Sequence, residues 1–260
     1  MEDTIAQEDL ENLLSQLESF LGTKPICYLK FCSKEKYANS VLEGNLFSNT
    51  PRYFREKEKE TGDRGQGDAD ELILALQTEN ILVVDNETGN PVFSFPKGKM
   101  RLRFNDDDSI PIVSFTGFTL REMKLVSANE KSATFVFPFS QEEYAEMGKQ
   151  FGEYCVIIGA RELEEKIASY CGNIDCEFLF DKVEYCSQNR IDRMQAFNTS
   201  SAERFLYKNE DLAYQHEYRM VLPIEIPADH YIRIGKLENA KVVPSSTLQN
   251  LVFSISYTSL

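Results

Sequence analysis

The chain has 260 residues, of which 42% are hydrophobic and 12% aromatic, so it can bury a substantial core. No apolar run reaches the length of a membrane span, and the first residues lack the pattern of a signal peptide, so we expect a cytoplasmic protein without a membrane partner. The net charge of −14 repels nucleic acid at long range, so contact with RNA or DNA would need a local basic cluster, for which residues 97–103 and 190–193 are the candidates.

The six cysteines lie among apolar neighbours without a CxxC pair, and the chain has only two histidines. A zinc site needs four ligands at close spacing, and this sequence does not supply them. We therefore expect free, buried thiols in a reducing compartment and no metal site.

The first predicted element is an amphipathic helix over residues 4–21. Thr4 and Gln7 can form a capping box, and Gly22 is placed to end the helix. Its leucines recur at helical spacing and form one stripe: Leu10, Leu13, Leu14, Leu17 and Leu21. The stripe either packs on the protein's own core or docks a partner protein or a second copy of the chain.

A compact unit follows, with a strand over 26–32, a short helix and a second strand over 45–49. Ser33 is the predicted N-cap of the helix and Gly44 its stop signal. Such a unit would bring Tyr28 and Lys30 close to Ser48 and Asn49.

The most charged segment covers residues 52–60, where alternating signs indicate a solvated helix face. The glycine-rich stretch after it, residues 62–71, lets backbone approach a ligand closely. Arg64, Asp68 and Glu71 are the candidate functional side chains there. No Gly-Lys-Ser/Thr step closes the stretch, so it is not a P-loop.

The rest of the chain predicts mainly short strands. These are expected over 81–84, 92–95, 100–104, 110–118, 154–158, 178–185, 231–237 and 251–255, with helices over 140–151, 162–170 and 189–206. Ser140 is the predicted N-cap of the first of these helices. The aspartates of 106–108 read as a solvated turn rather than a cation site. Strands outnumber helices without βα alternation, so we expect a single α+β domain, 1–260, with a mixed or antiparallel sheet and residues 1–22 as an appended helix.

Near the end of the chain, Tyr214–Leu222 places Glu217 at the start of a predicted buried strand. A carboxylate at the first residue of a buried strand is a suitable catalytic group for an enzyme that uses a single acidic residue. The alternative is structural: Glu217 pairs with Arg219 or Lys208 to finish the strand end.

Blocks in both halves of the chain resemble a group of bacterial proteins that is in turn similar to ADP-ribosyltransferases, especially the toxins that modify nucleic acid in toxin–antitoxin and anti-phage systems. The matching blocks are 30–31, 37–39, 42–44, 46–51, 53–55, Arg64 with Asp68 and Glu71, 154–158, 183–185, Lys208, 214–219 and 234–237. The resemblance implies a split-sheet transferase fold and NAD as the substrate.

The same resemblance assigns roles to individual residues. Glu217 would be the catalytic acid, which stabilises the oxocarbenium-like state formed when the nicotinamide–ribose bond breaks. The other assignments are NAD contacts by Tyr28, Lys30, Asn49, Tyr53, Arg55, Arg64 and Tyr214, with support from Asp68, Glu71, Lys208, Gln215 and Arg219. Within this set the arginines would bind the diphosphate and a tyrosine would cover nicotinamide. Tyr28 and Lys30 stand where transferases offer His or Arg.

The expected activity is therefore transfer of ADP-ribose from NAD to a macromolecule, RNA or DNA, by a toxin in anti-phage defence. Two alternatives remain open. One is a non-catalytic defence module that senses a phage protein or a nucleotide, and the other is a toxin that hydrolyses NAD.

Overall fold

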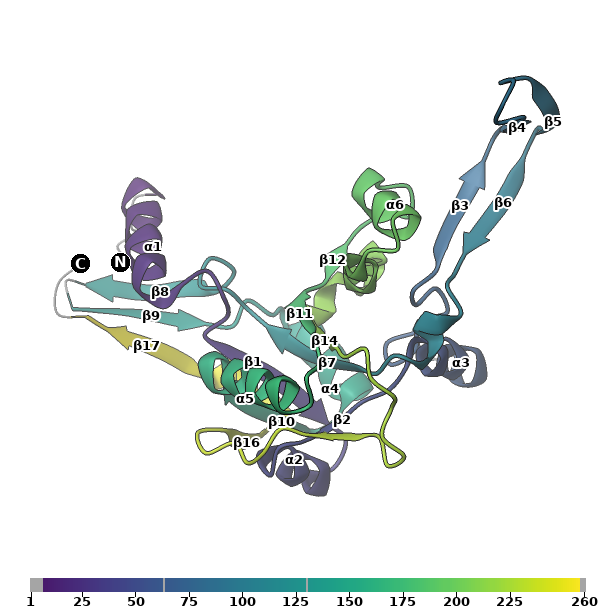
Figure 1. Ribbon diagram of the computed structural model, residues 1–260. Helices are drawn as coiled ribbons and strands as arrows, with labels where there is room; N and C mark the ends of the chain where they lie inside the picture. The colour runs from purple at the N-terminus through teal and green to yellow at the C-terminus, as the bar shows by residue number, and fades with distance from the viewer. Residues whose placement is uncertain (1–6, 63, 130, 258–260) are drawn as a thin grey trace.

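The computed structural model describes residues 7–62, 64–129 and 131–257. Its centre is a six-stranded sheet in which every neighbouring pair is antiparallel (Figure 1). The strand order is β11 (Leu179–Lys182), β14 (Glu217–Val221), β7 (Ile112–Gly117), β1 (Cys27–Cys32), β10 (Tyr154–Gly159) and β16 (Lys241–Pro244). The expected α+β class with an antiparallel sheet is confirmed.

The two central strands of this sheet are only partly paired. β1 and β7 meet at two positions, Tyr28 with Gly117 and Leu29 with Thr116. Beyond them the Ser114 carbonyl accepts a hydrogen bond from the Lys30 ammonium, at 2.6 Å, rather than from a backbone N–H. A lysine therefore satisfies a strand acceptor where the sheet opens, and the opening leaves room for a cavity.

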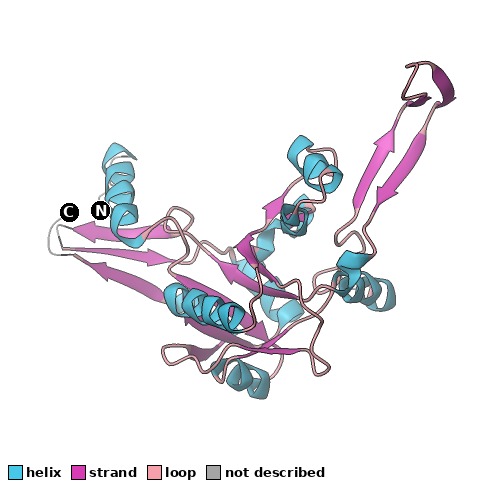
Figure 2. Cartoon of the chain, viewed as in Figure 1, coloured by secondary structure: helices cyan, strands magenta, loops and turns pink. Residues whose placement is uncertain are grey.

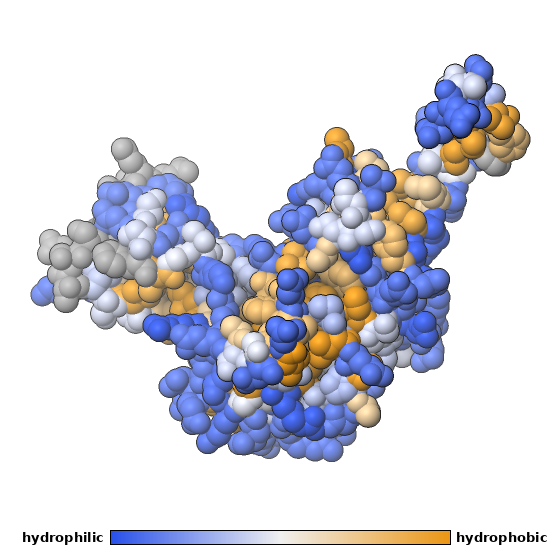
Figure 3. Space-filling model, viewed as in Figure 1, coloured by the Kyte–Doolittle hydropathy of each residue, from blue (hydrophilic) through white to orange (hydrophobic). Residues whose placement is uncertain are grey.

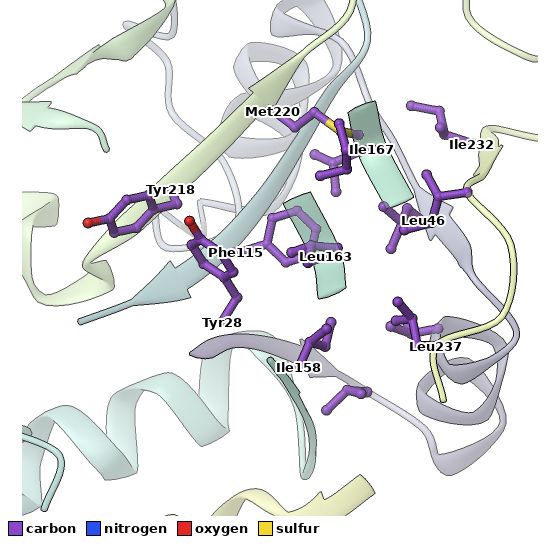
Figure 4. Close-up of a cluster of buried hydrophobic side chains, with 14 of the residues drawn as sticks. Tyr28, Leu46, Phe115, Ile158, Leu163, Ile167, Tyr218, Met220, Ile232 and Leu237 are labelled. Atoms are coloured by element: carbon purple, nitrogen blue, oxygen red, sulfur yellow. The ribbon is translucent and has the colours of Figure 1, made fainter. Parts of the chain in front are cut away.

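One face of the sheet is covered by α2 (Glu35–Leu42) and α5 (Ala160–Asn173). Aromatic and aliphatic side chains from the strands and from α5 meet there, as Figure 4 shows for Tyr28, Phe115, Tyr218 and Leu163. Because successive strand residues point to opposite faces, Tyr218 and Met220 enter this core while Glu217 and Arg219 face the other side.

The opposite face is covered by α1 (Gln7–Leu21), α4 (Gln141–Phe151) and the three-stranded sheet of β17 (Val252–Ser256), β9 (Ser132–Val136) and β8 (Lys124–Asn129). Leu14 and Leu17 of α1 are buried in this second core. Four leucines of the stripe thus pack on the protein's own core, whereas Leu21 is 48% exposed. The predicted cap at Thr4 lies outside the described residues.

Shorter elements complete the fold. The strand β2 (Asn45–Phe47) pairs with β15 (Tyr231–Arg233), and α3 (Pro51–Thr61) follows β2 directly. The other short elements are β12 (Glu184–Tyr185), which runs parallel to β13 (Tyr207–Lys208), α6 (Ile191–Asn198), and the 3-10 helices η1 (Asp106–Ser109), η2 (Ala202–Leu206), η3 (Glu210–Gln215) and η4 (Ser245–Asn250).

Residues 74–104 form a long two-stranded arm that projects from the body (Figures 1 and 2). Its lower half pairs β3 (Leu74–Thr78) with β6 (Gly98–Leu102), and its upper half pairs β4 (Ile81–Val84) with β5 (Pro91–Phe95). The sequence predicted β4 and β5 but not β3, and it gave no hint that these strands leave the body.

Capping predictions had mixed outcomes. Ser140 forms a complete capping box with Glu143 at the start of α4, as predicted. The prediction for α2 is wrong, because Lys34 rather than Ser33 occupies the N-cap and no side chain caps the helix. Gly44 does follow α2 with a φ of +79°, and its backbone lies against Gly235 so closely that no side chain fits.

The predicted solvated turn at residues 106–108 is also wrong for two of its three aspartates. Asp107 is buried and accepts two hydrogen bonds from Arg204, at 2.6 and 2.7 Å. Asp108 is buried against the guanidinium of Arg55. Charges that look solvated in sequence are here neutralised by arginines from distant segments.

Candidate functional site

A cavity of about 470 Å³ lies where β1 and β7 separate. Its walls come from these strands, from α2, α3, α4, η3, β2, β13, β14 and β15, and from the loop 65–71. This size falls in the range of sites for small molecules and cofactors, roughly 300–1,000 Å³.

Glu217 lines the cavity and is 3% exposed. One carboxylate oxygen accepts hydrogen bonds from the Ser114 hydroxyl at 2.5 Å and Arg219 Nε at 2.9 Å. The other accepts from Lys208 Nζ at 2.8 Å and Arg219 Nη2 at 3.4 Å. A carboxylate has about four acceptor positions, so all of them are occupied.

The two cations that bind Glu217, Arg219 and Lys208, also donate hydrogen bonds to other residues. Arg219 donates to both oxygens of Glu71, at 2.7 and 3.3 Å, and to the Phe205 carbonyl at 2.7 Å, which together with Glu217 uses all five of its N–H groups. Lys208 donates to Gln215 at 2.9 Å and to Glu217, so two of its three N–H groups have described partners. Among the described residues, the third N–H group of Lys208 has no hydrogen-bond partner.

The local backbone explains why these groups converge. His216 ends η3 in the left-handed region, with φ of 44° and ψ of 46°, and its ring packs 4.7 Å from that of Phe118. β14 begins at the next residue, so Gln215 and Glu217 both reach the cavity. The Gln215 amide then donates to the Gly65 carbonyl at 3.1 Å, which joins the glycine-rich loop to the strand.

Two acids of the cavity have pKa values displaced in opposite directions. Burial opposes ionisation of Glu217, but Arg219 and Lys208 hold its pKa well below the usual value. Burial, together with the nearby Glu71, raises the pKa of Asp68 to about 6. Near neutral pH Glu217 is therefore firmly ionised, whereas Asp68 exchanges its proton.

The outer walls of the cavity, where side chains are exposed to solvent, are aromatic. Tyr37, Phe47 and Tyr53 line it and are 39%, 47% and 39% exposed, and Tyr231 packs 5.4 Å from the Phe47 ring. Lys57 lies one helical turn after Tyr53, with its ammonium 5.8 Å from that ring. Among the described residues, Lys57 has no ion-pair partner.

Nine of the predicted site residues line this cavity: Lys30, Asn49, Tyr53, Asp68, Glu71, Lys208, Gln215, Glu217 and Arg219. The Lys30 ammonium donates to the Ser114 carbonyl, and burial lowers the pKa of Lys30. The two halves of the chain named in the sequence analysis thus meet at one site.

The prediction that Tyr28 faces the cleft is corrected. Tyr28 is 2% exposed in the core on the opposite face of the sheet, where its ring lies 5.0 Å from Phe180 and 5.3 Å from Tyr218. Its hydroxyl donates to Glu164 at 3.0 Å. Strand alternation puts Leu29, and not Tyr28, on the face of Glu217.

Three further residues are also misplaced by the prediction. Arg55 points inward from α3 and donates to the Glu71 carbonyl at 2.9 Å, so its guanidinium braces the loop instead of lining the cavity. Arg64 is exposed and pairs with Asp211 outside the cavity. The Tyr214 hydroxyl donates to Gln150 at 2.5 Å.

Sequence reasoning missed Ser114, Lys57 and three of the aromatic residues, Tyr37, Phe47 and Tyr231. The spacing of Tyr53 and Lys57 along α3 placed them on one helix face and could have suggested a shared role. Nothing in the sequence indicated that β15 brings Tyr231 beside Phe47.

Within the described residues, no group of three or more His, Cys, Asp or Glu side chains is arranged to hold a metal ion. No helix in the described part of the chain is long and apolar enough to cross a membrane. Comparison with known proteins finds no matching family model, curated protein or solved structure.

Proposed function

We propose that the cavity binds NAD and that the chain transfers ADP-ribose to a macromolecule, as a toxin in anti-phage defence. The observation that carries the proposal is an ionised carboxylate, Glu217, in a cavity whose outer walls are aromatic. RNA or DNA as the acceptor, and an antitoxin as partner, rest on the sequence resemblance alone.

The aromatic wall suits the two rings of NAD. Planar heterocycles stack on aromatic side chains, and Tyr37, Phe47 and Tyr53 are the exposed rings of this wall. Lys57 supplies a positive charge beside Tyr53 for the diphosphate. It takes over the role that the sequence analysis gave to Arg55 and Arg64.

Glu217 would stabilise the positive charge that develops on the ribose as the bond to nicotinamide breaks. Its acceptor positions are full, so a ribose hydroxyl binds it only by replacing a donor. The Ser114 hydroxyl is the one neutral donor, and it can rotate away without leaving a buried charge unpaired.

Asp68 is the group best suited to accept the acceptor's proton. It lines the same cavity and its pKa, raised to about 6, lets it take up and release a proton near neutral pH. In the proposed reaction the electron pair of the ribose–nitrogen bond leaves with neutral nicotinamide. The acceptor oxygen or nitrogen bonds to the ribose carbon, and its proton passes to Asp68.

Incubation with NAD labelled in its adenine ring tests the proposal. We expect nicotinamide release and label on a macromolecule of a cell extract. Tyr53→Ala should raise the KM for NAD about tenfold, the loss of one stacked ring. Phe178→Ala, a ring of matching exposure (40%) that does not line the cavity, should leave it unchanged. Release without labelled macromolecule would instead indicate hydrolysis, and no release with any extract would refute both reactions.

The filled coordination of Glu217 favours one second candidate, a non-catalytic module that senses a nucleotide. In that case the four donors around Glu217 are a structural network, and ligand binds without displacing any of them. A thermal shift with NAD or another nucleotide, abolished by Tyr53→Ala and accompanied by no nicotinamide release, would support this function over transfer.

A further inference from the structure

Asn49 is a buried polar side chain whose amide has no partner within the described part of the chain. Hydrophilic residues dominate the face of the molecule in Figure 3, where water can pair with them. Asn49 is instead 6% exposed and lines the cavity. Its backbone pairs with Ile112 in both directions, but no described residue donates to its amide oxygen or accepts from its amide nitrogen. A buried amide without partners costs free energy, which a ligand in the cavity would recover.

The Asn49 amide can be reached from the cavity. Among the described residues, Nε of Arg193 is the only fully enclosed side-chain nitrogen or oxygen atom that lacks a partner. The unpaired amide atoms of Asn49 are therefore not fully enclosed, and the space that they face is the cavity.

Strand alternation places an aromatic ring beside this amide. Phe47 and Asn49 line the cavity, whereas Leu46 packs in the core and the Ser48 hydroxyl donates to a backbone carbonyl on the opposite side. Phe47 is 47% exposed at the mouth, and Asn49 lies deeper, two residues or roughly 7 Å further along the extended chain. A planar heterocycle that stacks on the Phe47 ring can thus reach the amide with its edge.

The spacing between Asn49 and Glu217 selects which heterocycle of NAD this is. Asn49 pairs with Ile112, and Ser114, two residues further along β7, donates to Glu217 at 2.5 Å. Two residues of a strand span roughly 7 Å. A six-membered ring that is bonded to a ribose carbon beside Glu217 and that carries a carboxamide bridges a gap of this size. Adenine does not, because it is attached to the other ribose, on the far side of the diphosphate.

We propose that Asn49 determines specificity for a carboxamide on this ring, and so for NAD over its deamidated form. The inference rests on the proposed function, because it takes the ring beside Glu217 to be nicotinamide. The Asn49 amide has a donor and an acceptor side by side, and a carboxamide ligand offers the complementary pair. A carboxylate in its place offers acceptors only, so the amide oxygen of Asn49 faces another oxygen and one of the two hydrogen bonds is lost.

Calorimetric titration of the full chain with NAD and with nicotinic acid adenine dinucleotide tests this. NAD should bind at least about tenfold more tightly, as expected for a contact made by both ends of an amide. Asn49→Leu should abolish the preference by weakening NAD binding. It should not lower the melting temperature, because the native amide makes no hydrogen bond within the described chain. Equal affinities in the native chain, an unchanged preference in Asn49→Leu, or no binding of either dinucleotide would overturn the inference.

Ser48→Ala is the matched control. Ser48 is the adjacent residue, with 0% exposure, and its hydroxyl donates to the His230 carbonyl at 3.0 Å on the side away from the cavity. This variant should lower the melting temperature and leave the ratio of the two affinities unchanged. A change in the ratio as large as that of Asn49→Leu would indicate local distortion in place of a direct contact, and would refute the role of Asn49.

Two further measurements separate this inference from its alternatives. Nicotinamide hypoxanthine dinucleotide keeps the carboxamide but carries a deaminated adenine. If the native chain rejects it and Asn49→Leu does not, Asn49 contacts adenine and the nicotinamide assignment is wrong. Nicotinamide release is followed in the same samples. A preference for NAD that depends on Asn49, without release, would support the inference and refute both transfer and hydrolysis, whereas release without any preference would refute the inference alone.

Discussion

Replacement of Glu217 by glutamine should destabilise the fold strongly. The native carboxylate receives Lys208 at 2.8 Å and Arg219 at 2.9 Å, on different oxygens, and its side chain is 4% exposed. The glutamine side chain has one acceptor oxygen and one NH₂ group, which is a donor. Either Lys208 or Arg219 therefore loses its acceptor and faces an N–H group instead. Removal of one partner from a buried ion pair costs about 3–5 kcal/mol, and we expect a loss of that size at pH 7.

The pH dependence of this loss follows from the direction of the pKa shift. Because the pKa of Glu217 is lowered in the folded chain, its stabilising contribution is complete above the pKa of an unfolded glutamate, about 4.3, and is lost as pH falls toward the folded value. The difference in unfolding free energy between the native chain and Glu217→Gln should be constant from pH 6 to 8 and should shrink in acid.

Urea unfolding followed by far-ultraviolet circular dichroism measures both effects, since the chain has no tryptophan. Glu165→Gln is the matched control, because Glu165 is 64% exposed in a helical pair with Arg161, a pair worth about 0.3–0.5 kcal/mol. Adding Lys208→Met to Glu217→Gln should recover part of the loss, because it removes the stranded charge. A loss below about 1 kcal/mol at pH 7 would mean that the ion-pair network does not exist as described.

Three further outcomes are expected. Gly44→Ala should lower the unfolding free energy by more than about 2 kcal/mol, because the added β-carbon would lie 1.9 Å from the Gly235 carbonyl oxygen. Gly22→Ala is the control in the same melts. Gly22 has a similar φ of +82° but no atom near the added β-carbon, so this variant should cost only about 1–2 kcal/mol. Asp68→Asn should gain stability relative to the native chain as pH rises from 4 to 6, because the folded pKa of about 6 lies above the unfolded one, and a flat difference over that interval would contradict the burial of this carboxyl. Lys57→Glu should weaken the thermal shift given by NAD more than the shift given by nicotinamide alone, because only NAD carries the diphosphate, and equal losses would exclude that contact.

Local signals in the sequence predicted much of the scaffold. The capping box at Ser140 and the buried strand that begins at Glu217 were both readable, because each depends on residues within a few positions of one another. The halves of the cavity were predicted for the same reason. Their assembly into one site involves β1 and β7, which are more than 80 residues apart, and no local pattern specifies that pairing.

The errors arise where a side chain's surroundings depend on distant segments. Strand alternation shows that Tyr28 and Leu29 face opposite ways, but only the register with β7 decides which of them shares a face with Glu217. Asp107 and Asp108 looked solvated because their partners, Arg204 and Arg55, are remote in sequence. A run of acidic residues therefore predicts an exposed segment unless the cations that pair with it are known.

Lys30 shows how the opening of the sheet constrains the site. Its ammonium fills the place of a backbone donor at the Ser114 carbonyl, and its pKa is lowered by burial, so it is committed to the gap between β1 and β7. The Ser114 hydroxyl meanwhile donates to Glu217. One residue thus joins the split in the sheet to the carboxylate beneath it. A ligand that replaces the Ser114 hydroxyl as a donor to Glu217 therefore leaves the hydrogen bond from Lys30 to the Ser114 carbonyl intact. The hydrogen bonds of the cavity can thus change while β1 and β7 stay apart.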